Sequence, residues 1–255
     1  MNCNLCQDRG IILKGDVAAP CSCTAKRNKE RLINNSLLPK KFLNCTFDKF
    51  KFEYYDRNFI DEEKGISSYD LAKIAYQSAR DFAANFLKDP NTDGLLFTGP
   101  VGSGKTFLAC CIANALLKKG QVVLFTVVPE LLDQIRSTYD TERDPEALTE
   151  YDLVDTARQV PLLILDDLGA HNYTEWTINK IYSIINYRLN YHLPVIVTTN
   201  IEPLDLEHYL GDRTTSRLRE MCRTCRLLVD IDIRAVQRKE KDRCFLKAEE
   251  KLKPR

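Results

Sequence analysis

The chain has 255 residues, of which 44% are hydrophobic and 29% charged, and its formal net charge is +1. This composition is typical of a globular protein, and the small net charge argues against a strongly basic protein that coats DNA. No stretch is long and apolar enough to span a membrane, and charged residues stand where a signal peptide needs an apolar core. We therefore expect a cytoplasmic protein without a membrane partner, whose ten cysteines are thiols or metal ligands.

Four cysteines lie near the start of the chain in the pattern C-x2-C-x14-C-x-C: Cys3, Cys6, Cys21 and Cys23. Two cysteine pairs separated by a short loop fit a tetrahedral Zn²⁺ site with four thiolate ligands. The apolar run at 11–13 predicts a small hairpin resembling a zinc ribbon, stabilised by the metal. A closed site of this kind leaves no position for substrate, so its predicted role is structural. The alternative is four reduced thiols on a disordered arm.

The order of apolar runs and helical periodicities predicts an α/β fold. After a basic helix or linker at 25–38, a helix is expected at 67–88. Strands are then expected at 95–98, 122–127, 162–165, 195–198 and 227–231, alternating with helices at 105–119, 129–139, 145–158, 174–190, 204–210 and 213–222. Such alternation indicates a parallel sheet with helices on both faces. We expect two domains, a cysteine-rich module with its linker helix at 1–40 and the α/β domain at 41–255.

A glycine-rich loop joins the first strand of this domain to the helix that follows. It consists of Gly99, Pro100, Val101, Gly102, Ser103, Gly104, Lys105 and Thr106. Strand, loop and helix together form the context of a Walker A motif, in which backbone N–H groups surround phosphate oxygens. Lys105 is predicted to bridge the β- and γ-phosphates, and Thr106 to place its hydroxyl on Mg²⁺. The predicted cofactors are therefore ATP and Mg²⁺.

An apolar strand that ends in two acids has the form of a Walker B motif. Asp166 is predicted to hold Mg²⁺, and Asp167 to polarise the attacking water. Aspartate is one methylene shorter than the glutamate common at the second position, which predicts slow hydrolysis. The alternative interpretation is a capped turn.

Polar groups that follow later elements complete the predicted site. Asn200 ends the apolar strand near 195–198, where its amide can sense the γ-phosphate or the lytic water. Arg213 and Arg217 lie four residues apart on one helical face, which suits either an arginine finger or a solvated basic face. Arg234 follows the last expected strand and is a candidate second sensor. Residues 212–255 contain 14 Lys/Arg against 8 Asp/Glu, a charge that suits nucleic acid or a solvated helical end.

The remaining cysteines give weaker signals. Cys110 and Cys111 lie within the apolar helix after the phosphate loop and are expected in the core. Cys222 and Cys225 have the spacing of metal ligands, but no second pair lies nearby in the sequence.

Taken in order, these motifs resemble the AAA+ ATPases, and more narrowly the clade of bacterial helicase loaders (DnaC/DnaI type) and the transposition helper IstB. The resemblance covers roughly residues 40–235. It rests on Pro39–Phe42, Thr46-Phe47, Gly99–Thr106, Leu165–Gly169, Thr198–Asn200 and Arg213–Leu218. It implies that Asn200 is sensor I, Arg213 an arginine finger acting in trans with Arg217 as second candidate, and Arg234 sensor II. It also implies that a helical insertion around 130–150 faces single-stranded DNA.

The implied function is ATP-dependent loading of a replicative DNA helicase. The cysteine module is similar to the helicase-binding zinc domain of DnaI-type loaders, which implies a hexameric helicase as partner. Single-stranded DNA and further copies of the ATPase domain are the other implied partners, with slow, assembly-dependent hydrolysis. The alternatives are an IstB-like transposition helper, an adaptor that binds ATP without hydrolysing it, and a small-molecule kinase, for which no acceptor site is apparent.

Overall fold

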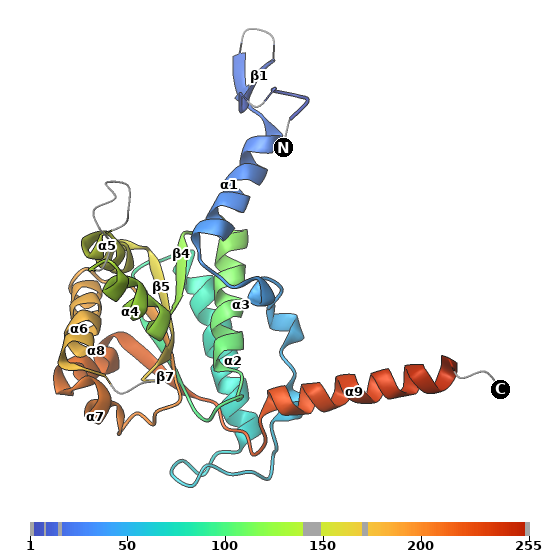
Figure 1. Cartoon of the computed structure of the whole chain (residues 1–255), viewed down its shortest axis with the longest axis vertical. Helices are drawn as coiled ribbons and strands as arrows, with labels where there is room; N and C mark the ends of the chain where they lie inside the picture. The colour runs from blue at the N-terminus through green and yellow to red at the C-terminus, as the bar shows by residue number, and fades with distance from the viewer. Residues whose placement is uncertain (1–2, 8, 15–16, 140–148, 170–172, 253–255) are drawn as a thin grey trace.

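A five-stranded parallel sheet forms the centre of the molecule in the computed structural model, which describes residues 3–7, 9–14, 17–139, 149–169 and 173–252 (Figure 1). Its strands lie in the order β4-β5-β6-β3-β7. They are β3 Gly94–Thr98, β4 Val123–Val127, β5 Leu162–Leu168, β6 Val195–Thr199 and β7 Cys222–Arg226. All pairings between them are parallel, so the carboxyl ends of the strands meet at one edge, where such sheets bind ligands.

Helices cover both faces of this sheet, as the alternation of strands and helices predicts. They are α2 Ser68–Phe86, α3 Lys105–Lys118, α4 Val128–Ser137, α5 Glu150–Gln159, α6 Glu175–Asn190, α7 Leu206–Leu210 and α8 Asp212–Met221. On β3, Leu95 and Phe97 pack with α2 and α3, whereas Leu96 packs with α4 to α8 on the other face (Figure 1). Strands buried on both faces read as continuous apolar runs, which is why the sequence reveals them.

The last strand lies five residues earlier than the sequence predicts. The expected strand at 227–231 is irregular, and the polar segment Cys222–Arg226 pairs with β3 instead. Because β7 is an edge strand, only Cys222 and Cys225 need to be buried, and Arg223 and Thr224 are exposed. Two of the apolar residues that suggested a strand still enter the core, since Leu227 and Val229 are buried, whereas Ile231 is exposed.

The N-terminal segment is a hairpin followed by a helix. Strands β1 (Ile11–Lys14) and β2 (Val17–Pro20) pair antiparallel, as predicted, and α1 spans Ser22–Asn35. Figure 1 shows the hairpin beyond the body of the molecule, at the outer end of α1. Just after α1, the Ser36 carbonyl accepts a hydrogen bond from the Phe125 N–H at 2.8 Å. Since β4 is an edge strand, this bond attaches the end of α1 directly to the sheet.

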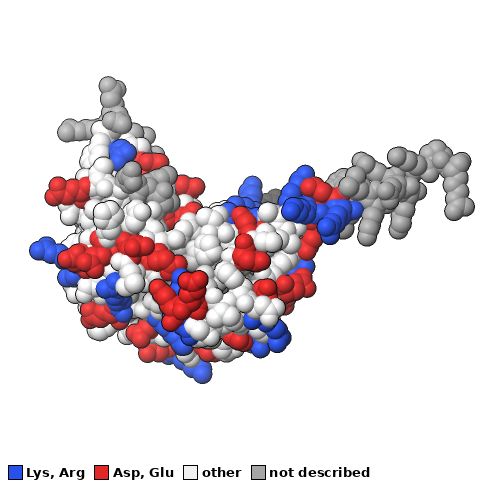
Figure 2. Space-filling view, turned by 90° about the horizontal axis from the view of Figure 1, so that it is seen from below, with Lys and Arg blue, Asp and Glu red and all other residues white. Residues whose placement is uncertain are grey.

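The chain ends in the helix α9, Ile233–Leu252, which projects away from the body (Figure 1). From Ile233 to Arg243 it carries five basic residues against two acidic ones: Arg234, Arg238, Lys239, Lys241 and Arg243 against Glu240 and Asp242. Figure 2 shows acidic and basic side chains interspersed over the body, and basic ones gathered along the described part of α9. No described helix is long and apolar enough to cross a membrane.

Candidate nucleotide-binding site

The predicted phosphate loop lies between the carboxyl end of β3 and the start of α3. Gly104 adopts a φ of +95° at the helix cap, and a Cβ there would lie 2.7 Å from the hydroxyl oxygen of Tyr55. That hydroxyl donates to the Ser103 carbonyl at 2.8 Å, so the aromatic segment before α2 supports the loop from outside. The ring of Tyr55 stacks on that of Phe50, 5.4 Å away, which keeps the hydroxyl in place.

Lys105 is a buried cation held by backbone oxygens. Its side chain donates from Nζ to the carbonyls of Gly99 and Pro100, both at 2.7 Å, and the residue is 5% exposed. Burial lowers the pKa of Lys105 to about 8, and the charges of Asp167 and Asp166 partly oppose this shift. A desolvated ammonium group among carbonyls is a fitting partner for phosphate oxygens, so the loop meets the chemical requirement of a nucleotide site.

The two residues that are predicted to contact Mg²⁺, Thr106 and Asp166, are hydrogen-bonded to each other. Thr106 donates its hydroxyl to Oδ1 of Asp166 at 2.8 Å, and Thr198 on β6 donates to the same oxygen at 2.6 Å. Burial raises the pKa of Asp166, while these two hydrogen bonds lower it. A hydroxyl and a carboxylate at the end of the phosphate loop are the hard oxygen ligands that Mg²⁺ prefers.

The second acid lies beside the predicted sensor. Asp167 adopts a φ of +60°, and its Oδ1 accepts a hydrogen bond from Nδ2 of Asn200 at 3.2 Å. The structure thus brings Lys105, Asp166 and Asn200 to one edge of the sheet, the arrangement that hydrolysis of a nucleotide needs. Their individual roles stay predictions.

The three predicted arginines occupy different environments. Arg213 is exposed at the start of α8. Arg217 is partly buried, because its Nε donates to Oδ1 of Asn186 at 2.7 Å and its guanidinium lies 4.8 Å from the ring centre of Tyr182. Arg234 is exposed in the first turn of α9, where its charge contributes to the lowered pKa of Lys105. The trans and sensor roles of these arginines stay predictions.

The sequence contains no indication of an ion-pair cluster, one arginine with three acids, that lies at the same edge of the sheet. Arg226, the last residue of β7, forms ion pairs with Asp61 at 2.8 Å and with Glu63 and Glu202 at 3.0 Å. Glu202 lies two residues after Asn200, the predicted sensor. The ion pairs of Arg226 therefore join the segment after β6 to the loop before α2. No spacing in the sequence signals this cluster, because the partners of Arg226 come from two segments that are distant from it in the sequence, the loop with Asp61 and Glu63 and the segment with Glu202.

The four N-terminal cysteines form the group that their spacing predicts. All four Sγ atoms lie within 4.8 Å of one another. Backbone N–H groups of Cys6 and Leu5 lower the pKa of Cys3 to about 6, whereas a side-chain hydrogen bond with Cys6 raises the pKa of Cys23 to about 12. Neighbouring thiols share protons in this way until a metal replaces those protons. The cluster can therefore bind zinc, and within the described residues it is the one such group of His, Cys, Asp or Glu.

Four further cysteines, two on α3 and two on β7, lie in the core. Cys110 and Cys111 are fully buried in α3, as predicted, and Cys222 and Cys225 are buried on β7 away from the N-terminal group. Burial raises the pKa of each of these four thiols, which keeps them protonated and inert.

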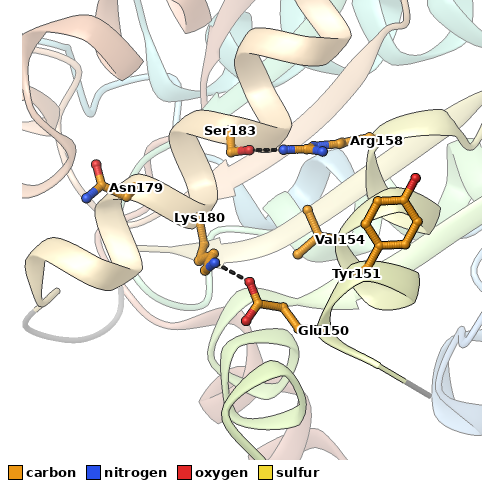
Figure 3. A pocket seen from close by; sticks show the side chains of 7 residues that line it. All are labelled: Glu150, Tyr151, Val154, Arg158, Asn179, Lys180 and Ser183. Atoms are coloured by element: carbon orange, nitrogen blue, oxygen red, sulfur yellow. Dashed lines mark hydrogen bonds and ion pairs between the residues drawn. The ribbon is translucent and has the colours of Figure 1, made fainter. Parts of the chain in front are cut away.

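A separate hollow of about 480 Å³ lies between α5 and α6 (Figure 3). Four of its polar side chains are paired with one another, Lys180 with Glu150 and Arg158 with Ser183. None of the residues that line it belongs to the phosphate loop or the two acids. We therefore assign the nucleotide to the edge of the sheet and not to this hollow. The predicted DNA-facing insertion at 130–150 lies partly outside the described residues, because 140–148 are not among them.

Comparison with known proteins shows which family the chain is similar to. The family of IstB-like ATP binding proteins matches residues 26–242. The replicative helicase loader DnaI of Bacillus subtilis is 28% identical over 142 residues, 55% of this chain and 44% of that protein. The uncharacterized protein YqaM of the same organism is 28% identical over 227 residues, 85% of this chain and 64% of that protein. The chain thus spans less than two thirds of the length of both relatives.

A solved structure agrees with the fold. The crystal structure of the DnaC helicase loader superimposes with a TM-score of 0.58 at 27% identity, covering 75% of this chain and all of that one. The chain therefore belongs to the family of IstB-like ATP-binding proteins, and its fold is that of the AAA+ helicase loaders.

Proposed function

We propose that this protein is an ATP-driven loader of a replicative DNA helicase. The observation that carries the proposal is the attachment of a four-cysteine cluster to a phosphate-loop domain through α1, whose end is hydrogen-bonded to β4. The similarity to proteins named helicase loaders supports the same partner. In this proposal, residues 1–40 hold Zn²⁺ and bind the helicase, and residues 41–255 bind ATP.

The proposed ATPase chemistry uses groups from the phosphate loop and from the carboxyl ends of β5 and β6. Lys105 and the N–H groups of the loop bind and orient the phosphates, and Thr106 and Asp166 hold the Mg²⁺. The metal supplies charge stabilisation to the phosphates when bound. Asp167 takes up the proton of the attacking water, and Asn200 holds that water or the γ-phosphate in line.

Full activity is proposed to need a second copy of the chain. Arg213 is exposed at the start of α8, where it is free to approach the γ-phosphate bound by a neighbour. The equivalent role is less suited to Arg217, because its guanidinium is engaged by Asn186 and Tyr182. Hydrolysis is therefore proposed to be slow in the monomer and faster in the assembly.

Single-stranded DNA is the second proposed macromolecular partner. The described part of α9 carries an excess of three positive charges, whereas acidic and basic side chains are interspersed over the body in Figure 2. Phosphate backbones bind basic surfaces with an affinity that falls with salt. We therefore assign α9 to the DNA, and we expect binding to weaken as the salt concentration rises.

A loading assay tests the proposed function. A single-stranded circle covered by single-strand-binding protein is incubated with the helicase of the same source, ATP and either the wild-type protein or Lys105→Ala. Helicase bound to the circle with wild type alone supports the proposal. Equal loading with both proteins, or with neither, contradicts it. The alternative of a transposition helper predicts stimulation of a transposase instead.

A further inference from the structure

The strand that carries the two Walker B acids is irregular at those acids. Strands β5 and β6 are in register at Leu165, opposite Val197, and again at Leu168, opposite Thr199. Two residues of β5, Asp166 and Asp167, therefore lie opposite the single residue between Val197 and Thr199. This is the geometry of a β-bulge, which interrupts the hydrogen-bond ladder and re-aims side chains.

Thr198 is the single residue opposite the bulge, and its hydroxyl contacts both acids. It donates to Oδ1 of Asp166 at 2.6 Å and accepts a hydrogen bond from the N–H of Asp167 at 3.0 Å. The residue is fully buried. One side-chain hydroxyl thus orients the first carboxylate and gives a partner to the backbone of the second residue.

The bond to Asp167 is important because that residue has an unfavourable backbone conformation. Its φ of +60° lies in the left-handed region, which costs free energy for any residue with a Cβ. An N–H that loses its ladder partner at a bulge must also find another acceptor. Thr198 supplies that acceptor, so it holds the conformation from which the Asp167 side chain meets Asn200.

The hydrogen bond from Thr198 to Asp166 leaves the Thr106 hydroxyl available to coordinate Mg²⁺. Both hydroxyls donate to the same oxygen, Oδ1 of Asp166. If the Thr106 hydroxyl turns to Mg²⁺, Thr198 still holds the carboxylate in its orientation. Hydrogen bonds to the groups around a metal commonly set its affinity in this way.

We infer that Thr198 is a positioning residue, which sets the direction of both Walker B carboxylates across the bulge and thereby couples Mg²⁺ to nucleotide binding. The inference rests on the proposed nucleotide chemistry of this site. Thr198 itself touches neither phosphate nor metal. Its effect is transmitted through Asp166 and Asp167.

A matched control exists on the neighbouring strand. Thr98 on β3 is also fully buried, but its hydroxyl has no hydrogen-bond partner among the described residues. Replacing either threonine by valine keeps the side-chain shape and removes the hydroxyl. Only the change at Thr198 removes bonds to the acids.

The test measures the dissociation constant of a fluorescent ATP analogue with and without Mg²⁺, together with kcat, for Thr198→Val, Thr198→Ser and Thr98→Val. Mg²⁺ should increase the nucleotide affinity of wild type, and we expect this increase to be roughly 10- to 100-fold smaller in Thr198→Val. We expect kcat of this variant to fall by a similar factor. Its affinity without Mg²⁺ should stay unchanged. Thr198→Ser should recover the wild-type values, and Thr98→Val should match wild type.

Three outcomes would overturn the inference: an unchanged Mg²⁺ dependence in Thr198→Val, an equal loss in Thr98→Val, or no recovery in Thr198→Ser. Thermal melting confirms that each variant is folded. If Thr198→Val does not fold, Thr198→Cys, a weaker donor of similar size, must show the same loss. A wild type without turnover would contradict the proposed ATPase, while the Mg²⁺-dependent affinities would still decide the role of Thr198.

Discussion

The carboxylate of Asp232 lies directly against the Cα of Gly102 in the phosphate loop. A Cβ built on Gly102 would lie 1.9 Å from Oδ1 of Asp232. The next residue, Ile233, donates its N–H to the Gly102 carbonyl at 3.2 Å, and Asp232 accepts the Arg234 N–H at 2.8 Å as the cap of α9. The start of α9 is therefore docked on the loop that is assigned to the phosphates.

Gly102→Ala should disturb both the loop and α9. The φ of Gly102 is +74°, which costs alanine about 1–2 kcal/mol, and the added methyl group also meets Asp232. We expect nucleotide affinity to fall by about tenfold or more. Asp232→Ala in the same chain should relieve the contact and restore part of the affinity. Isothermal titration measures both, and a Gly102→Ala protein with wild-type affinity would contradict the docking.

Lys105→Met should abolish nucleotide binding without lowering the stability of the fold. Burial lowers the pKa of Lys105 to about 8, so the fold disfavours its charge, and methionine of similar length removes that cost. We expect a melting temperature without nucleotide at least as high as that of wild type, and no rise on adding ATP and Mg²⁺. A rise equal to that of wild type would show that Lys105 does not contact the nucleotide.

Arg213→Ala should abolish the concentration-dependent part of ATP hydrolysis and leave ATP binding nearly intact. Arg217→Ala serves as the comparison, because loss of its bond to Asn186 should lower the free energy of unfolding by about 1 kcal/mol. Turnover is measured over a range of protein concentrations. Equal loss of binding and hydrolysis in Arg213→Ala would place its action within its own subunit.

The cysteine cluster should contain one Zn²⁺ per chain. Replacing Cys3 and Cys6 by serine removes two of the four ligands, so the metal content measured by atomic emission should fall to near zero. We expect the hairpin to lose structure while ATP affinity stays unchanged, since the cluster lies at the outer end of α1 (Figure 1). Cys222→Ser provides the control, and retention of zinc by the double variant would contradict the assignment.

The sequence predicted most of the sheet because four of its strands are buried on both faces and appear as apolar runs. It missed the position of β7, because this edge strand contains two arginines and a threonine and shows little hydrophobic signal. The Walker A residues could be predicted because one local loop contains them, and the Walker B acids because they directly follow an apolar run of the same strand. The roles of Arg188, which is fully buried and donates to the Val160 carbonyl, and of Arg226 could not be predicted, because these partners are distant in the sequence.

The most direct test of the loader account is native mass spectrometry of the protein mixed with the replicative helicase of its own source, with and without ATP. The account predicts complexes in which several copies of this chain are added to the helicase hexamer. These complexes should disappear when Cys3 and Cys6 are replaced by serine. Absence of any complex under every nucleotide condition would contradict the account, and a transposase would then be the next partner to examine.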